Sequence, residues 1–355
     1  MSEQLFKNKL VVGPAPHLGT KDSIPRIMWS VVVALVPAMI VAAINFGWYA
    51  IAVTVVSIIT AVVTEAVIQR FRGAPITVSD GSAVVTGLLL AMCLPPNVPI
   101  YAPIVGSFFA IAVAKHAFGG LGFNIWNPAL AGRAFLLAAY SGAIVMAKWP
   151  ILQHVFSGSI FGADAVTRAT PCAVMKSAPF AFFEHYSLGQ LFLGNVPGCI
   201  GETSALALLI GASLLIIKKY INWRLPLAYI LTVMILTVML PVPDGSGGYY
   251  TLWGGRYWAE PGFLFSRAIA EALSGGLVLG AFFMATDMVT SPLTSKGQAF
   301  YGIGCGVLVA VIRLYGGYPE GVCYSILIMN TVVWLIDKIT IPRFFGELKH
   351  GAKNA

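Results

Sequence analysis

The chain has 355 residues, of which 58% are hydrophobic and only 10% are charged. So few charged side chains cannot cover a water-soluble core of this size, which excludes an ordinary soluble domain and favours a chain embedded in lipid. The net charge is +8, but the 22 basic residues are scattered over short polar connections and form no basic face or tail. Nucleic acid is therefore not expected as a partner.

Apolar runs separated by turn residues predict ten membrane-spanning helices, because a helix satisfies its own backbone hydrogen bonds in lipid. A polar leader precedes the first run, and no small-residue cleavage pattern follows at the distance of a signal peptide, so the first helix is expected to be retained. The expected spans are 26–44, 48–69, 82–94, 100–118, 127–146, 202–217, 225–241, 267–287, 298–315 and 321–340.

The distribution of basic residues predicts the orientation of these spans. If the helices alternate in direction, most of the 22 Lys and Arg residues fall in connections on the side of the two termini. The positive-inside rule places that side in the cytoplasm. The long connection after the fifth span then lies outside the cytoplasm.

An internal repeat appears when the sequence is shifted by 197 residues. This offset aligns Pro95 with Pro292, and it aligns AKHAFGG (114–120) with VIRLYGG (311–317). Because five spans is an odd number, two homologous halves must be inverted relative to each other. The expected divisions are a cytoplasmic leader (1–25), a first five-helix repeat (26–146), an extracytoplasmic insertion (147–201), a second five-helix repeat (202–341) and a cytoplasmic tail (342–355).

Two segments are expected to break helices near the middle of the membrane. TVSDGSAVVTG (77–87) and GLGFNIWNPALAGR (120–133) both place small residues and helix-capping side chains directly before an apolar run. Inverted repeats commonly place such irregular helices at the interface of their halves, where their binding sites lie.

Two acidic residues are candidates for an ion pathway, because an ionisable group inside a span is costly. Asp287 lies within the expected eighth span, and Asp80 stands beside Gly81 at the start of the third. The alternative for Asp80 is a helix cap. For Asp287 it is a cap at a helix break or an internal ion pair with Arg133 or Lys115.

Other polar residues have less specific patterns. Glu65 and Glu202 lie near the ends of spans, where we expect their carboxylates to reach toward water. Lys115, Asn124 and Asn127 could line a pore.

The cysteines predict no metal centre made by this chain alone. They show no C-x-x-C spacing, and most of them lie in or beside apolar runs, where cysteine usually packs as a small core residue. They are Cys93, Cys172, Cys199, Cys305 and Cys323.

A short polar stretch in the insertion, DAVTRATPC (164–172), stands out from the apolar chain. Its structural reading is a turn opened by Asp164 and Thr167. Its pattern also resembles D-x-x-[ST]-x-A-T, the sequence on which a flavin transferase esterifies the final threonine, here Thr170, with the phosphate of FMN. Arg168 departs from the glycine that soluble flavin carriers have at this place, although a guanidinium there can pair with a phosphate.

Three further stretches resemble a known family. They are PAPHLGTKDSIPRIMWSVVVALVPA (14–38), SDGSAVVTGLLLAMCLPP (79–96) and FNIWNPALAGRAF (123–135). Together with the flavin-transferase pattern, they occur in the order expected of the D subunits of the Rnf complexes. The chain is also similar to the B subunits of the sodium-pumping NADH:quinone oxidoreductases, which have a longer amino-terminal region.

The resemblance implies an all-α, ten-helix membrane protein of urea-transporter-like fold. FMN is expected to be bound covalently at Thr170, which makes the chain a phosphoprotein, with Asp164, Thr167 and Arg168 in the recognition sequence. Arg133 could hold a flavin phosphate or a partner carboxylate. Riboflavin is a possible second flavin, without a motif to place it.

The family implies electron transfer between ferredoxin and NAD⁺, coupled to Na⁺ or H⁺ translocation across a prokaryotic cytoplasmic (inner) membrane. In such a complex the chain is a redox subunit with no catalytic residue of its own. The expected partners are membrane lipid, the A, B, C, E and G subunits of the Rnf complex, and a flavin transferase during maturation.

Two alternatives remain open at the level of sequence. An inverted repeat also suits a stand-alone channel or transporter for a small polar solute such as urea, and a membrane bundle can be a passive scaffold. The sequence around Thr170 distinguishes them, because neither alternative has a use for a transferase recognition sequence.

Overall fold

The computed structural model describes residues 22–140, 170–177, 181–202, 204–243, 249–250, 261–318 and 320–341. The regular structure of these residues is helical except for one antiparallel ribbon, formed by β1 (Val242–Pro243) and β2 (Tyr249–Tyr250). The expected helical class is therefore confirmed. Most of the leader, the tail from 342 and much of the insertion lie outside the described residues.

The first half of the chain, residues 22–140, begins with a long helical hairpin. Its two helices are joined at Gly47, whose φ of 74° lies in the left-handed region that favours glycine. Shorter helices follow and pack on the hairpin. The elements of this half are α1 (Ile24–Phe46), α2 (Trp48–Phe71), η1 (Val78–Asp80), α3 (Ser82–Met92), α4 (Tyr101–Phe109), η2 (Ala110–His116) and α5 (Pro128–Ala139).

Three short helices belong to the insertion, and the second half of the chain follows them. The short helices are α7 (Pro171–Ser177), α8 (Phe182–His185) and α9 (Leu188–Leu193). The second half contains α10 (Ala205–Ile217), α11 (Arg224–Met239), α13 (Pro261–Leu273), α14 (Leu277–Leu279), η4 (Gly280–Met284), α15 (Ser295–Tyr315) and α16 (Val322–Thr340).

Several helices have the length and composition of membrane spans. Within the described residues these are α1, α2, α15 and α16, and the bent pair Gly262–Leu273 and Leu277–Met284 can form a fifth. The helices α3, α5, α10 and α11 are apolar but have only 10–17 residues. The chain is thus a multi-pass membrane protein, while the number of ten spans stays a prediction.

The eighth expected span is interrupted. The sequence predicts one helix over 267–287, but the structure breaks it at residues 274–276 and bends it by 61°. Gly275 adopts a φ of 53° there, a conformation that a helix interior cannot contain. The expectation of a continuous helix is wrong, because the apolar run contains a pair of glycines at which the helix breaks.

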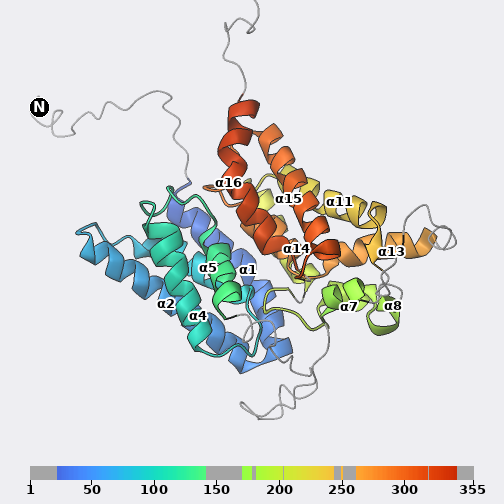
Figure 1. The fold of residues 1–355 in the computed structure, drawn as a ribbon. Coiled ribbons are helices and arrows are strands. Elements are labelled where there is room, and N and C mark those ends of the chain that lie inside the picture. Colours follow the sequence, from blue (N-terminus) through green and yellow to red (C-terminus); the bar gives the residue numbers. More distant parts are fainter. Residues whose placement is uncertain are drawn as a thin grey trace, which may run out of the picture.

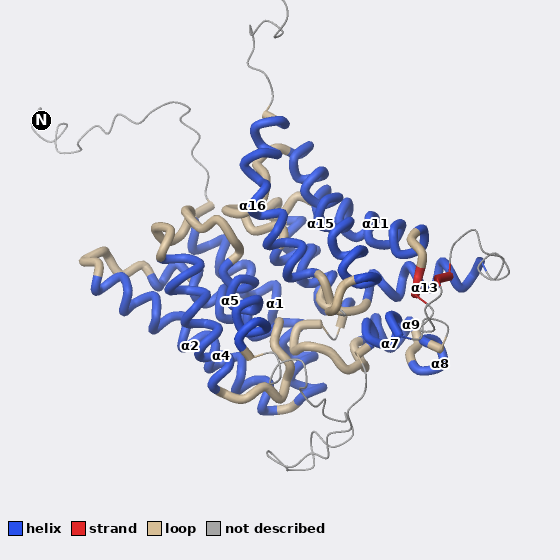
Figure 2. The backbone as a smooth tube through the Cα atoms, in the orientation of Figure 1, coloured by secondary structure: helices blue, strands red, loops and turns tan. Residues whose placement is uncertain are grey.

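The two halves share one core. In Figure 1 the blue and teal helices of the first half lie beside the orange and red helices of the second, and α7 and α8 lie near the second half. Figure 2 shows that loops interrupt the helices on both sides of the contact. The largest buried cluster joins Leu35, Leu90 and Leu130 with Leu208 and Ile326. Large apolar side chains on the outer faces of α1, α2 and α16 stay exposed, as expected where lipid covers them.

Candidate functional site

Thr170 directly precedes α7 and is a half-buried residue. Its Oγ1 accepts a hydrogen bond from the backbone N–H of Ala173 over 3.3 Å. Its carbonyl accepts from Val174. Pro171 follows as the first residue of the helix, where a missing N–H has no cost. The other residues of the pattern, Asp164, Thr167 and Arg168, lie outside the described residues.

Helix α7 is anchored to the second half of the chain. The Cys172 sulfur packs against the backbone at the break of the eighth span, where a Cβ on Gly275 would lie 2.6 Å from it. The Lys176 ammonium donates a hydrogen bond to the carbonyl of Gly316, at the end of α15. Thr170 therefore lies two residues before the contact of Cys172 with the helix break.

One buried and one half-buried carboxyl group face the guanidinium of Arg133. Arg133, from α5, lies 2.6 Å from Glu320 and 3.4 Å from Glu202. We call Glu202 and Glu320 the acid pair. The side chain of Glu202 is 1% exposed and that of Glu320 is 20% exposed. Arg133 thus has partner carboxylates, which is one of the two roles expected for it.

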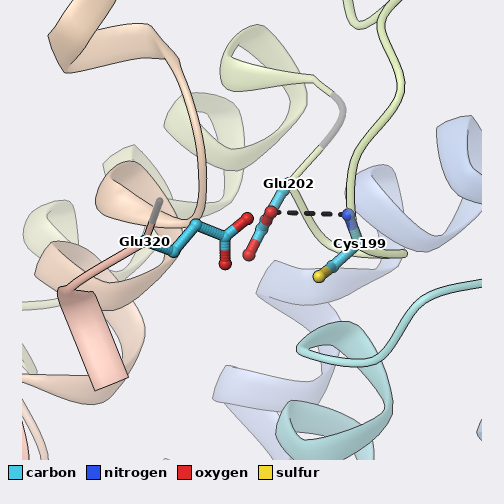
Figure 3. Close-up of side chains that lie close together, drawn as sticks. All are labelled: Cys199, Glu202 and Glu320. Carbon is cyan, nitrogen blue, oxygen red and sulfur yellow. Dashed lines mark hydrogen bonds between the residues drawn. The ribbon is translucent and has the colours of Figure 1, made fainter. Parts of the chain in front are cut away.

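The carboxyl group of Glu202 has an unusual environment for an acid. Glu202 lies in the connection before α10, outside the helix. Burial, followed by the nearby carboxyl of Glu320, raises the pKa of Glu202 to about 7. Arg133 and the N–H of Cys199, which donates to Glu202 over 3.4 Å (Figure 3), act in the opposite direction. The group can therefore gain or lose a proton near neutral pH.

The acid pair and Cys199 also have the chemistry of a metal site. Their three ligand atoms lie within 4.8 Å of one another (Figure 3), and thiolate and carboxylate groups are common ligands. However, Arg133 already contacts all three residues, since its guanidinium lies 3.8 Å from the Cys199 sulfur. A metal ion would have to displace this cation, so the geometry fits an acid pair bridged by a guanidinium better than a metal centre.

A second buried ion pair lies at the beginning of α3. The Lys115 ammonium donates to Glu65 over 2.8 Å and to the Ser82 hydroxyl over 2.7 Å. Asp80 accepts from the N–H and the hydroxyl of Ser82 over 2.8 and 2.7 Å, which is an Asx turn directly before α3, whose N-cap is Gly81. Taken as whole residues, Glu65 is 1% exposed and Glu202 is 7% exposed. The expectation that these two carboxylates reach water is therefore wrong, because each has a buried cation as partner.

Asp287 lies in the turn after η4 and not within a helix. Its carboxylate accepts from the Thr290 hydroxyl over 3.2 Å and from the N–H of Val289 over 3.5 Å, within a turn that no helix follows directly. It also lines a cavity of about 90 Å³ between the two halves of the chain. The polar lining includes Lys115, Asn124 and Asn127, so the residues expected to line a pore do meet at one cavity.

The sequence analysis did not predict two groups of the buried ion-pair network. Arg313, inside α15, lies 2.9 Å from the Glu271 carboxylate and donates to the Ser274 carbonyl over 2.8 Å. Glu320 is partner to Arg133 although 187 residues separate them. An arginine within an apolar helix was a usable signal for Arg313. No local pattern marks Glu320, which lies in a connection.

These features define a class of protein. Apolar helices of membrane length, helices broken inside the apolar region and buried ion pairs at the breaks are typical of multi-pass membrane proteins that transport ions or small solutes. The chain belongs to the NQR2, RnfD, RnfE family, which it matches over residues 11–346.

Relatives cover almost the whole chain. It is 47% identical over 350 residues to the D subunit of the proton-translocating ferredoxin:NAD(+) oxidoreductase complex of Clostridium ljungdahlii, covering 97% of this chain and 98% of the relative. It is 46% identical over 342 residues to the D subunit of the Na(+)-translocating ferredoxin:NAD(+) oxidoreductase complex of Acetobacterium woodii, covering 96% of each. The D subunit of an ion-translocating oxidoreductase complex from Methanosarcina acetivorans is 33% identical over 336 residues, covering 94% of this chain and 96% of the relative.

Proposed function

We propose that this chain is the subunit of an ion-translocating ferredoxin:NAD⁺ oxidoreductase complex that carries FMN esterified to Thr170 and relays electrons within the membrane. The observation that carries the proposal is the match to the transferase recognition sequence in a chain whose relatives, over nearly their full length, are named as the D subunits of such complexes. A stand-alone solute channel or a passive scaffold would need neither feature.

The described residues fit the attached group. Thr170 is half-buried, its hydroxyl accepts a hydrogen bond from the N–H of Ala173, and an esterified oxygen keeps a lone pair for this donor. FMN, when bound, supplies the electron-transfer chemistry, and the protein supplies position and electrostatics. Helix α7 holds the attachment point through Cys172 and Lys176. Arg133 is engaged by the acid pair and not directed to a phosphate.

Two inverted five-helix repeats form the membrane part. Supporting this, each half has a short helix whose N-terminal end adjoins a buried ion pair: Lys115 and Glu65 at α3, and Arg313 and Glu271 near the start of α14. The offset of 197 residues aligns Arg313 with the neighbour of Lys115. A duplicated unit explains why the same arrangement occurs twice.

The complex lies in the cytoplasmic membrane with both termini of this chain inside and the segment around Thr170 outside, as the basic connections support. Its partners are the other Rnf subunits and, during maturation, a flavin transferase. Sequence similarity does not distinguish H⁺ from Na⁺ as the coupling ion. The relative with 47% identity is named for H⁺ translocation, and the relative with 46% identity is named for Na⁺ translocation. Asp287 and Asp80 stay candidates for the ion pathway, and riboflavin for a second flavin.

The test is in-gel flavin fluorescence of the complex, produced together with its transferase and separated under denaturing conditions. We expect a fluorescent band for this polypeptide that is lost completely in Thr170→Ala. Ser187→Ala is the matched control, because Ser187 also accepts from a backbone N–H over 3.3 Å at the start of a helix in the same insertion. Fluorescence that persists in Thr170→Ala contradicts the proposal.

A further inference from the structure

The helix break at Gly275 and Gly276 joins the two parts of the candidate site. A Cβ on Gly275 would lie 2.6 Å from the Cys172 sulfur and 3.5 Å from Cγ of Glu320. A Cβ on Gly276 would lie 2.8 Å from Oε1 of Glu202. Two adjacent residues without side chains therefore let α7 and the acid pair approach the same point of the backbone, so Cys172, two positions after Thr170, lies close to the acid pair.

The charges of this cluster do not balance when both carboxyl groups are ionised. Arg133 provides one positive charge, and the acid pair provides two negative charges in surroundings with little water. Two carboxylates that share a buried site do not both ionise readily. One proton on the pair makes the cluster neutral, and it gives one carboxyl group a hydrogen-bond donor toward the other.

The cluster also has an unused donor and one partly exposed carboxyl group. Arg133 is 8% exposed, and among the described residues no acceptor lies within hydrogen-bond distance of its Nε. The guanidinium can therefore adjust its hydrogen bonds when the charge of the pair changes. The Glu320 side chain is 20% exposed while that of Glu202 is 1% exposed, so Glu320 is the more accessible carboxyl group of the pair.

The neighbouring charged and titratable groups come from several elements. Those that act on the acid pair and on the thiols beside it are Arg133 from α5, Cys93 at the end of α3, Cys199 from the connection before α10, Cys172 from α7, Glu271 from α13, Arg313 from α15 and Cys323 from α16. Arg133 is paired with the acid pair, and Arg313 and Arg267, the latter also from α13, both pair with Glu271. Within this network, Glu320 is the more exposed member of the acid pair.

Resting on the proposed function, we propose that Glu202 and Glu320 bind one exchangeable proton between them, and that some of the molecules lack this proton while the flavin attached at Thr170 is oxidised. These molecules take it up from water when an electron reaches the flavin. The electron comes from the preceding one-electron carrier of the complex and adds one negative charge to the flavin. The proton adds one positive charge to the acid pair. No covalent bond to the flavin is formed or broken.

Infrared difference spectroscopy of the purified complex tests the inference. We expect the reduced-minus-oxidised spectrum to contain the carbonyl stretch of a newly protonated carboxyl group, and we expect both Glu202→Gln and Glu320→Gln to lose it. Glu320→Asp keeps a titratable carboxyl and should retain a shifted band. Glu184→Gln, an exposed carboxylate on α8, is the matched control and should keep the wild-type band.

A titration of the oxidised complex separates this inference from the function on which it rests. The same carboxyl band should disappear as pH rises through about 7, the pKa of Glu202, with or without flavin on Thr170. If no band depends on Glu202, the inference is overturned, even when in-gel fluorescence places the flavin at Thr170. A band that titrates with pH but does not respond to reduction overturns the coupling to the flavin.

Discussion

At the scale of single residues, this protein keeps its buried charges in place by giving each a close partner. Arg133 is the central case, because one guanidinium serves two carboxyl groups and also contacts a thiol. Removing such a partner leaves an uncompensated charge in a dry site, which costs far more than the pair itself contributes. The side chain therefore stabilises the contact of α5 with the second half of the chain only while both acids are present.

We predict that Arg133→Met lowers the free energy of unfolding by about 3–5 kcal/mol, because the acid pair is then buried without its cation. The triple variant Arg133→Met, Glu202→Gln, Glu320→Gln should recover most of this loss. The measurement is thermal unfolding of the purified protein in detergent. Equal stability of the single and triple variants would show that Arg133 acts through packing and not through charge.

At the scale of elements, glycine decides where helices approach or break. Gly275 and Gly276 separate α13 from α14. Because they have no side chains, they leave room for the side chains of the site. Gly211 has a different role, because a Cβ there would overlap the carbonyl oxygen of Ala34. It allows α10 to pack directly on the backbone of α1, which is one of the main contacts between the halves. Small residues at close helix contacts are a general feature of membrane bundles.

We expect Gly211→Ala to destabilise the bundle by about 1–3 kcal/mol, because the added methyl group forces α10 away from α1. Gly262→Ala is the matched control: it changes a glycine in α13 with nothing within 4 Å of its new Cβ, and it should be neutral or slightly stabilising. Thermal unfolding in detergent compares the two. A Gly211→Ala protein as stable as the control would mean that α1 and α10 pack less closely than the structure shows.

At the scale of the whole molecule, orientation decides on which side of the membrane the segment at Thr170 lies. The positive-inside rule predicts that residue 219 lies inside and the insertion outside. All five cysteines are buried, so the native chain gives little background in thiol labelling. This permits a direct test with single added cysteines at exposed positions.

We predict that a membrane-impermeant maleimide labels Ser187→Cys in intact cells, and that it labels Lys219→Cys only in inverted vesicles. Both residues are exposed in the structure, so access to the reagent depends on the side of the membrane. Labelling efficiency in the two preparations is the measurement. The reversed pattern would place the segment at Thr170 in the cytoplasm and remove the proposed orientation.

The sequence by itself determined the membrane class, the helix positions to within a few residues and the candidate at Thr170, because hydropathy, turn residues and the transferase pattern are local properties of the chain. Only the tertiary structure decided the break of the eighth span and the partners of the buried charges. Arg133 meets Glu202 and Glu320 across 69 and 187 residues, and no local pattern encodes such a meeting. The contact arises because helices from both halves pack into one core. A charge buried in this core needs an oppositely charged side chain beside it, which can come from a distant part of the sequence.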